Sequence, residues 1–241
     1  MRAFMFDLDG TLSNSVPVII RTAKLACAEL GIETSEEELL NQIGLPMSRT
    51  GEMFLGPGRG QEYIDCYYRH YDPEGIVGFP GVPEMLADLR QAGFKLAVVT
   101  SRRRDSTLDS LRRIGIEDMF ERVICCEDTL NHKPHPEPLR FCCSEIGCAP
   151  DVSLYVGDSI YDMECANAAG LWSCGVTWGV AGEEGMAAQH PVYLAHTVAE
   201  LHDKLLNINT GKYLPTADEL MARSQQSDSD QPPTLDELLG R

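Results

Sequence analysis

Basic residues are scarce in this sequence. Its 241 residues include 20 lysines and arginines against 37 aspartates and glutamates, which gives a formal net charge of −17. A surface this acidic repels the phosphate backbone of nucleic acids and the anionic headgroups of membranes. We therefore expect neither a nucleic acid nor a membrane among the partners of this chain.

Long apolar runs are also lacking. No run approaches the roughly 20 residues that span a bilayer, and Asp7 interrupts the apolar N-terminal stretch, unlike the pattern of a signal peptide. Hydrophobic residues still make up 43% of the chain, enough for one large core or for a core with an inserted smaller unit. We expect a globular, cytoplasmic protein.

Paired cysteine motifs are missing too. The nine cysteines are an odd number and are scattered, with no Cys-x-x-Cys pair and only Cys125–Cys126 and Cys142–Cys143 adjacent. A zinc site is typically built from closely spaced ligand pairs, which are absent here. We expect buried, reduced thiols rather than a zinc or redox centre.

Apolar strands and amphipathic helices alternate along most of the chain. The pattern predicts strands over residues 2–6, 94–99, 122–126, 153–156 and 171–176. It predicts helices over residues 82–92, 106–114, 137–146 and 159–169, with Gly93, Gly115 and Gly147 closing the first three. Five strands separated by helices are typical of an α/β fold, with a Rossmann-like parallel sheet covered on both faces.

The stretch between the first strand and residue 82 has helical patterns and no convincing strand. A helix over residues 17–30 begins with Pro17, Ser35 and Glu38 are spaced as a capping box, and a further helix is expected over about residues 61–71. This stretch is therefore predicted to be an inserted, all-helical domain.

The flanks of the insertion are small or turn-forming residues, so that two crossings would join it to the sheet and permit a hinge. We assign residues 1–15 and 82–212 to the α/β core domain and residues 16–81 to the helical domain. Residues 213–241 are rich in Ser, Gln, Asp and Pro, which predicts an acidic, disordered tail.

The end of the tail permits a second interpretation. Thr234 and Glu237 are spaced to cap a short helix that would carry Leu235, Leu238 and Leu239. Such a helix would be a docking motif, whereas the simpler interpretation is a solvated tail with transient helix.

Four groups of polar residues follow four of the predicted strands. They are Asp7 and Asp9, Thr100 and Ser101, Lys133, and Asp158 with Asp162. Because the carboxyl ends of parallel strands share one edge of a sheet, we expect these side chains to meet there. Carboxylates bind Mg²⁺, while hydroxyl and ammonium groups hold anionic oxygens, so this set favours phosphoryl transfer.

Two of these carboxylates have distinct expected roles. Asp7 can attack phosphorus as a nucleophile only if Mg²⁺ and Lys133 offset its repulsion from the incoming phosphate. Asp9 can donate a proton to the leaving oxygen and later remove one from water.

At these residues the chain resembles the haloacid dehalogenase superfamily, and within it the phosphatases with a helical cap inserted after the first motif. The resemblance spans nearly all of residues 1–210 and rests on "FDLDGT", Thr100 at a strand end, Lys133 before proline, and "GDSIYD". It implies four catalytic residues: Asp7, Asp9, Thr100 and Lys133. It also implies substrate binding by Thr100, Ser101, Lys133 and Arg49, and a Mg²⁺ cofactor on Asp7, Asp9, Asp158 and Asp162.

The resemblance separates subclasses. Dehalogenases of the superfamily lack the carboxylate present here as Asp9, and its ion pumps need membrane spans. Its sugar-phosphate mutases tend to carry Glu-Asp where this chain has Gly157–Asp158, whereas "VGDSIYDMECANAAG" resembles phosphoglycolate phosphatases and related pyrophosphatases. We therefore predict a Mg²⁺-dependent phosphatase that hydrolyses a small phosphorylated metabolite through a phospho-aspartate. The substrate would be phosphoglycolate-like, a sugar phosphate or pyrophosphate.

Two alternatives remain beside this prediction. One is a sugar-phosphate mutase that uses the same aspartyl chemistry. The other is a weakly active binding protein that acts through its tail, an interpretation that the intact set of Asp7, Asp9, Lys133 and Asp158 disfavours.

The chain departs from the family pattern at two places. Asn14 stands where aspartate is common, and Ser101 is followed by Arg102, Arg103 and Arg104 instead of Lys-Pro. The arginines form either a solvated basic loop or a contact to a second anionic group of the substrate. Arg49 leaves the same choice open, between a substrate ligand on a cap loop and a surface residue.

Overall fold

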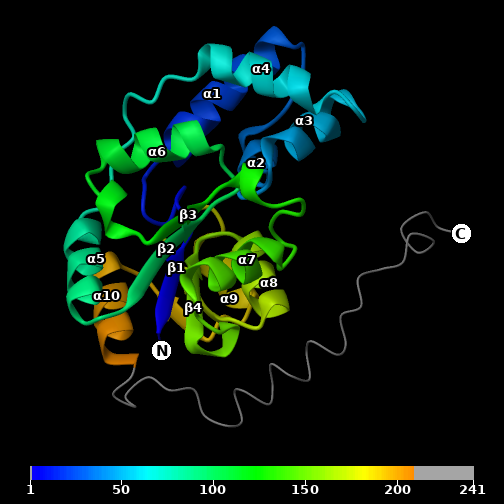
Figure 1. Ribbon diagram of the computed structural model, residues 1–241. Helices are drawn as coiled ribbons and strands as arrows, with labels where there is room; N and C mark the ends of the chain where they lie inside the picture. The colour runs from blue at the N-terminus through cyan, green and yellow to red at the C-terminus, as the bar shows by residue number, and fades with distance from the viewer. Residues whose placement is uncertain (1, 209–241) are drawn as a thin grey trace, which may run out of the picture.

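The computed structural model describes residues 2–208, and its centre is a parallel sheet of six strands (Figure 1). The strands are β1 (Ala3–Phe6), β2 (Lys95–Val99), β3 (Arg122–Ile124), β4 (Ser153–Gly157), β5 (Trp172–Val176) and β6 (Tyr193–Ala195). Their order in the sheet is β3-β2-β1-β4-β5-β6. The chain reverses direction across the sheet at β1, so the carboxyl ends of β1, β2 and β4 adjoin at the position where open α/β sheets bind ligands.

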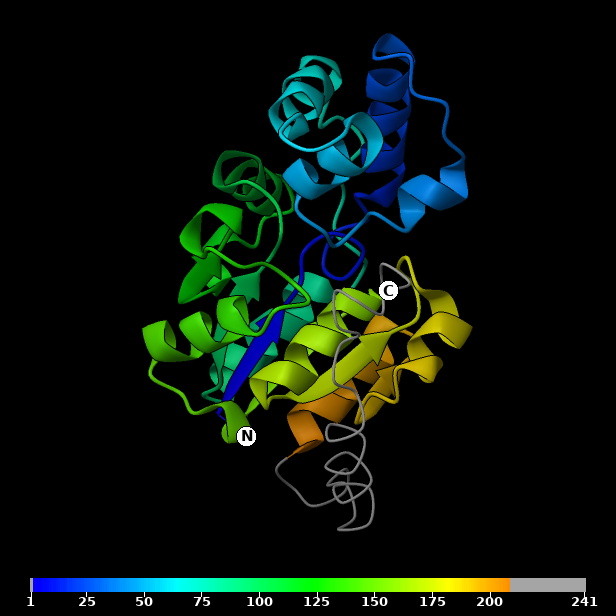
Figure 2. The same ribbon diagram turned by 90° about the vertical axis from the view of Figure 1, so that its right-hand side faces the viewer.

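Helices cover both faces of the sheet, as Figure 2 shows. Phe4 and Phe6 of β1 belong to an apolar cluster with α5 (Val82–Gln91), α6 (Arg104–Arg113) and α10 (Val198–Asn207). Ala3 and Met5 belong to a second cluster with α7 (Glu137–Ile146) and α8 (Ile160–Ala169). Because both faces of β1 are buried, its four residues are continuously apolar rather than alternating.

Four further helices form a layer beyond the carboxyl edge of the sheet (Figure 1). They are α1 (Val16–Glu29), α2 (Glu36–Leu40), α3 (Met47–Leu55) and α4 (Gly60–His70), and α1, α2 and α4 share an apolar cluster of their own. The predicted capping box begins α2, where the amides of Glu38 and Ser35 donate to the other residue's side chain. We call this layer the cap, and the predicted bounds 16–81 stay a prediction.

The chain crosses between core and cap at two adjacent places. The amide of Asn14 donates to the carbonyl of Val77 at 2.8 Å, and the amide of Phe79 donates to the carbonyl of Leu12 at 3.2 Å. These backbone bonds hold the outgoing and returning segments side by side. The side chain of Asn14 is exposed, so only the backbone of this residue takes part in the crossing.

The predicted fold class is confirmed, with two corrections. The expectation of five strands is wrong, since β6 adds a sixth whose three residues are too few to show a period. Helix α3 was not predicted from the sequence, because Gly51 lowers the helix propensity of this segment. The structure shows why glycine occupies this position: a Cβ there would lie 2.6 Å from Cβ of Tyr63 on α4.

Other predictions concern cysteine and the tail. All nine cysteines lie within the described range, and all are free, seven of them buried. None of the helices in residues 2–208 is long and apolar enough to cross a membrane. The predicted tail, 213–241, lies outside the described residues.

The α9 helix (Gly182–Ala188) completes the described secondary structure beside three short 3₁₀ turns. It follows β5 and packs against it through Met186, which fills the space above Gly175. The segment that joins β5 to α9 also passes the carboxyl edge of the sheet, where Gly179 and Val180 approach Asp158.

Candidate active site at the carboxyl edge of the sheet

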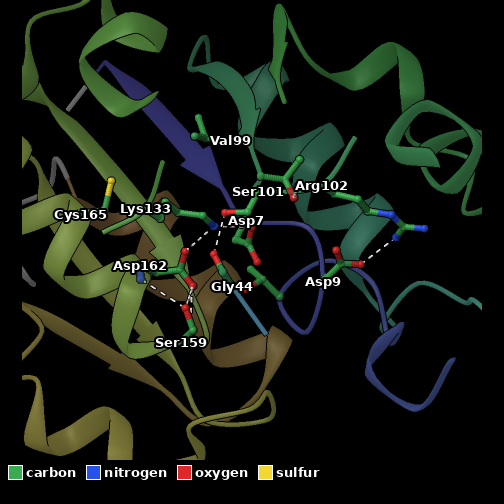
Figure 3. Close-up of polar contacts among 12 residues, drawn as sticks. Asp7, Asp9, Gly44, Val99, Ser101, Arg102, Lys133, Ser159, Asp162 and Cys165 are labelled. Atoms are coloured by element: carbon green, nitrogen blue, oxygen red, sulfur yellow. Dashed lines mark hydrogen bonds and ion pairs between the residues drawn. The ribbon is translucent and has the colours of Figure 1, made fainter. Parts of the chain in front are cut away.

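A buried ammonium group lies at the centre of the site (Figure 3). Nζ of Lys133 donates to Oδ1 of Asp7 at 2.8 Å, to Oδ1 of Asp162 at 2.7 Å and to the hydroxyl of Tyr155 at 3.1 Å. Lys133 is only 2% exposed. A charge this deeply buried requires such partners, and three acceptors satisfy all three of its N–H groups.

Asp162 is fixed by the local structure of α8. Ser159 is the N-cap of that helix and forms a capping box with Asp162, in which the amide and hydroxyl of Ser159 donate to Oδ2 at 3.0 and 2.6 Å. Oδ1 of Asp162 is thereby left for Lys133 and Tyr155. The spacing in "GDSIYD" is therefore both a helix start and a way of orienting a carboxylate.

Burial and neighbouring charges shift the pKa values of the groups at the centre. Burial raises the pKa of Asp7 well above its usual value; Lys133 opposes that rise, and the neighbouring carboxylates add to it. Burial alone would lower the pKa of Lys133, but Asp162 and Asp7 outweigh it and raise the pKa. The lysine therefore stays charged. Its single positive charge is shared by several carboxylates and stabilises each of them only in part.

The carboxylate of Asp158 is enclosed by Gly10, Thr11, Gly179 and Val180. Its Oδ1 accepts from the hydroxyl of Thr11 at 3.0 Å, and its Oδ2 accepts from the amide of Val180 at 2.8 Å. A Cβ at Gly10 or Gly179 would lie 2.2 or 2.1 Å from Oδ2, so the carboxylate fits only beside glycine. Burial and the Asp162 charge raise the pKa of Asp158 to about 7, against the two hydrogen bonds.

Gly179 was not identified from the sequence. Its only signal is that it follows a strand of the sheet, and single glycines after strands are too common to indicate a site.

Three carboxylates are close enough to share a cation. One oxygen each of Asp7, Asp158 and Asp162 lies within 4.8 Å of the others, and all three residues are buried. A single lysine faces these three acids, which leaves unbalanced negative charge. An all-oxygen set of this charge suits Mg²⁺.

The fourth expected metal ligand lies elsewhere. The Asp9 carboxylate is not part of this group, because its Oδ1 accepts from the hydroxyl of Ser15 at 2.6 Å and from Nη1 of Arg102 at 2.8 Å. The Asp9 side chain therefore lies apart from the other three carboxylates, and its predicted metal role stays a prediction. Arg102 belongs to the segment "TSRRR", for which the sequence left open whether the arginines are solvated or contact the substrate. In the structure Arg102 contacts Asp9 instead.

A second cluster of ligand-type residues lies in the cap, formed by Glu29, Cys66 and His70. Here both oxygens of Glu29 already accept hydrogen bonds, from Arg69 and from His70, and the Cys66 residue is fully buried. Glu29 is therefore engaged in an ion pair with Arg69, which joins α1 to α4.

The two residues after β2 contact different partners. Oγ1 of Thr100 accepts from the amide of Arg102 at 3.2 Å, whereas the hydroxyl of Ser101 donates to the carbonyl of Gly44 in the cap at 2.6 Å. The hydroxyl of Tyr161 also donates to a cap carbonyl, that of Asn41, at 2.9 Å. The core edge and the cap are therefore in direct contact around the site.

A cavity of about 100 Å³ lies between the core edge and the cap. Core residues that line it are Asp7, Asp9, Thr100, Ser101 and Arg102, and most of the cap lining is apolar or aromatic, including Tyr63, Tyr67, Tyr68 and Tyr71. Arg49 does not line this cavity, and is an exposed residue of α3 whose charge acts on Tyr161. Its predicted role as a substrate ligand stays a prediction.

A parallel sheet with carboxylates and a lysine at its carboxyl edge, beneath a helical cap, defines the class of fold: a Rossmann-like α/β core with an inserted helical cap. A family model described as haloacid dehalogenase-like hydrolase matches residues 4–176, and the chain belongs to this family. The resemblance inferred from the sequence is thereby confirmed, and with it the enzyme class, a phosphatase of this family.

The curated relatives include pyrophosphatases and phosphoglycolate phosphatases. A pyrophosphatase PpaX from Bacillus pumilus is 32% identical over 201 residues, covering 82% of this chain and 93% of the relative. A phosphoglycolate phosphatase from Salmonella typhimurium is 32% identical over 219 residues, covering 79% of this chain and 87% of the relative.

Solved structures share the fold. A predicted phosphoglycolate phosphatase from Haemophilus somnus has a TM-score of 0.74 and 26% identity, covering 87% of this chain and 98% of that one. A putative β-phosphoglucomutase from Bacteroides vulgatus has a TM-score of 0.78 at 18% identity, covering 88% and 91%, so it is a likeness of fold alone.

Close packing at Gly157 generates a prediction. A Cβ at this position would lie 2.4 Å from Cβ and 2.5 Å from Cγ of Asp162, so any side chain must displace that carboxylate from Lys133. Gly157→Ala should lower kcat/KM at least about tenfold and destabilise the fold by about 1–3 kcal/mol. Phosphate release and urea unfolding measure the two effects.

The matched control is Gly78→Ala, because a Cβ at Gly78 would meet its nearest atom, Cβ of Ile114, at an ordinary 3.5 Å. This variant should retain its activity and stability. Equal behaviour of the two variants would contradict the packing argument.

Proposed function

We propose that this chain is a Mg²⁺-dependent phosphatase that hydrolyses a small phosphorylated metabolite through a phospho-aspartate on Asp7. The observation that carries the proposal is the position of Asp7. It lines the cavity beneath the cap, bonds to Lys133 at 2.8 Å and shares the carboxylate cluster with Asp158 and Asp162. The pyrophosphatase and phosphoglycolate phosphatase names of the relatives support a compact anionic substrate.

In the first step, a carboxylate oxygen of Asp7 attacks phosphorus and the bond to the leaving oxygen breaks. With Mg²⁺ held by Asp7, Asp158 and Asp162, added positive charge would offset the repulsion between Asp7 and the incoming phosphate. Lys133 donates a hydrogen bond to Asp7 and adds positive charge beside it. Thr100 and Ser101 supply hydroxyl groups at the cavity wall. Ser101 would exchange its bond to Gly44 for one to a phosphate oxygen.

Asp9 is assigned the proton transfers. In its protonated form it gives its proton to the leaving oxygen, and the resulting carboxylate then takes a proton from the water that attacks the phospho-aspartate. Hydrolysis releases phosphate and restores the carboxylate of Asp7 and the proton on Asp9. The site therefore returns to its starting state with one water consumed.

A mutase that uses the same aspartyl step is disfavoured by the packing at Gly157. A glutamate there, as in the mutase pattern, would overlap Asp162 and disturb its bond to Lys133. The binding-protein alternative depends on the tail, which lies outside the described residues.

Replacing the proposed nucleophile is the direct test. Asp7→Asn should reduce kcat by about three orders of magnitude or more, since an amide is a poor nucleophile of the same shape. Folding raises the pKa of Asp7, so its charge opposes folding at neutral pH, and the variant should melt no lower than the parent in metal-free buffer.

The exposed Asp118→Asn is the matched control and should leave turnover unchanged. Near-parental turnover by Asp7→Asn, measured as phosphate release from a panel of phosphorylated metabolites, would contradict the mechanism.

Metal removal tests the carboxylate cluster. Chelation with EDTA should abolish turnover, and Mg²⁺ should restore it better than Ca²⁺, because Mg²⁺ requires a compact octahedral site while Ca²⁺ takes more ligands at longer distances. Mg²⁺ should also raise the melting temperature of the parent more than that of Asp158→Asn, because one oxygen ligand is lost. Full activity in metal-free buffer would refute the assignment.

The cap sets the expected substrate size. A cavity of about 100 Å³ between the core edge and cap side chains suits a compact leaving group better than a polymer. Phosphoglycolate, a sugar phosphate or pyrophosphate should give a kcat/KM at least about tenfold above that of a phosphopeptide, equivalent to about 1.4 kcal/mol of transition-state binding. Steady-state kinetics on both kinds of substrate decide this, and comparable values would overturn the argument.

A further inference from the structure

Arg102 is the one cationic side chain that lines the cavity within residues 2–208. Its side chain is 9% exposed, and Nη1 donates to Oδ1 of Asp9 at 2.8 Å. Nε donates to the hydroxyl of Ser106 at 3.2 Å, and Nη2 donates to the hydroxyl of Tyr71. Each nitrogen of the guanidinium thus has a protein partner, and three of its five N–H groups are engaged.

The Tyr71 contact joins the core to the cap. Tyr71 is the C-cap residue of α4, in the segment that leads to the returning crossing at Val77, and the guanidinium of Arg102 lies 5.4 Å from the centre of its ring. The ring is in turn packed against Tyr67 and Tyr68 of α4. The position of Arg102 therefore depends on where the cap places the end of α4.

The Asp9 contact joins Arg102 to the chemistry. Both hydrogen bonds that hold the Asp9 carboxylate, from Ser15 and from Arg102, go to the same oxygen, Oδ1. This arrangement orients the group and leaves Oδ2 for proton exchange with a bound substrate. Figure 3 shows Asp9 turned toward Arg102 and away from the group around Lys133.

We propose that Arg102 is a positioning residue that couples cap closure to the orientation of Asp9, through its joint contact with Tyr71. With the cap closed, the Tyr71 hydroxyl and ring fix the guanidinium, which in turn fixes Oδ1 of Asp9. With the cap open, Arg102 loses that partner and Asp9 is held by Ser15 alone. The inference rests on the proposed function, since it takes Asp9 as the group that protonates the leaving oxygen.

The test compares two phosphate esters that carry no charged group besides the phosphate. Ethyl phosphate needs a proton on its departing oxygen, whereas p-nitrophenyl phosphate releases a stable phenolate without one. Removing the ability of Asp9 to donate a proton therefore slows the first ester far more than the second. A defect that only loosens the fold or the phosphate site slows both esters alike.

The variants are Arg102→Met, which keeps much of the apolar stem, and Tyr71→Phe, which removes only the hydroxyl. Arg103→Met is the matched control. Arg103 lies 5.2 Å over the ring of Tyr68, a neighbouring cap tyrosine, but it is exposed and has no bond to Asp9. Asp9→Asn and the double variant Asp9→Asn with Arg102→Met complete the set.

Arg102→Met should lower kcat for ethyl phosphate at least about tenfold more than kcat for p-nitrophenyl phosphate, because general acid catalysis contributes about 10²–10⁴ in rate. Tyr71→Phe should show the same selectivity, reduced to about threefold because the Asp9 bond remains. Arg103→Met should show none. In the Asp9→Asn background, Arg102→Met should cause no further selective loss, since the two act through one group.

Several results would overturn the inference. Equal losses on both esters in Arg102→Met and Tyr71→Phe, with a selective loss in Asp9→Asn, would make Arg102 a structural residue and leave the proposed function standing. A loss by Arg102→Met confined to phosphoglycolate would make Arg102 a ligand for the substrate carboxylate instead. Equal losses in Asp9→Asn itself would refute the acid role, and the inference with it. Should Arg102→Met fail to fold, Tyr71→Phe decides alone.

Discussion

The ion-paired contact of Lys133 with Asp7 and Asp162 is the interaction on which the rest of the site depends. Three buried carboxylates at one edge of a sheet repel each other, and a single buried ammonium offsets only part of that repulsion. Such a group costs stability in the absence of a cation. The two apolar clusters on the faces of the sheet stabilise a fold that can carry this cost.

Space is the second constraint, and glycine satisfies it. A Cβ at Gly10, Gly157 or Gly179 would overlap a carboxylate of Asp158 or Asp162. The acids are thus packed against bare backbone, which restricts their positions in addition to the hydrogen bonds that they accept. The volume that a side chain at position 157 would need is occupied by Asp162.

The sequence allowed much of the fold to be predicted, because the relevant signals are local. Continuous apolar runs indicated β1, β2, β4 and β5, and a parallel sheet then required their polar ends to meet. The three residues of β6 and the glycine within α3 gave no such signal. Gly179 was missed for another reason: its role depends on the distance to Asp158, which no local pattern contains.

The contact between Asp9 and Arg102 shows the same limit at the active site. From the sequence, "TSRRR" is a basic loop whose three arginines are equivalent, and nothing local separates Arg102 from Arg103. The structure separates them through the cap: one guanidinium is buried between Asp9 and Tyr71, while the other lies over Tyr68 at the surface. An arginine bonded to a core carboxylate and a cap tyrosine responds to both parts of the protein. The position of the cap therefore bears on the Asp9 carboxylate, because Tyr71 contacts the same guanidinium that donates to it.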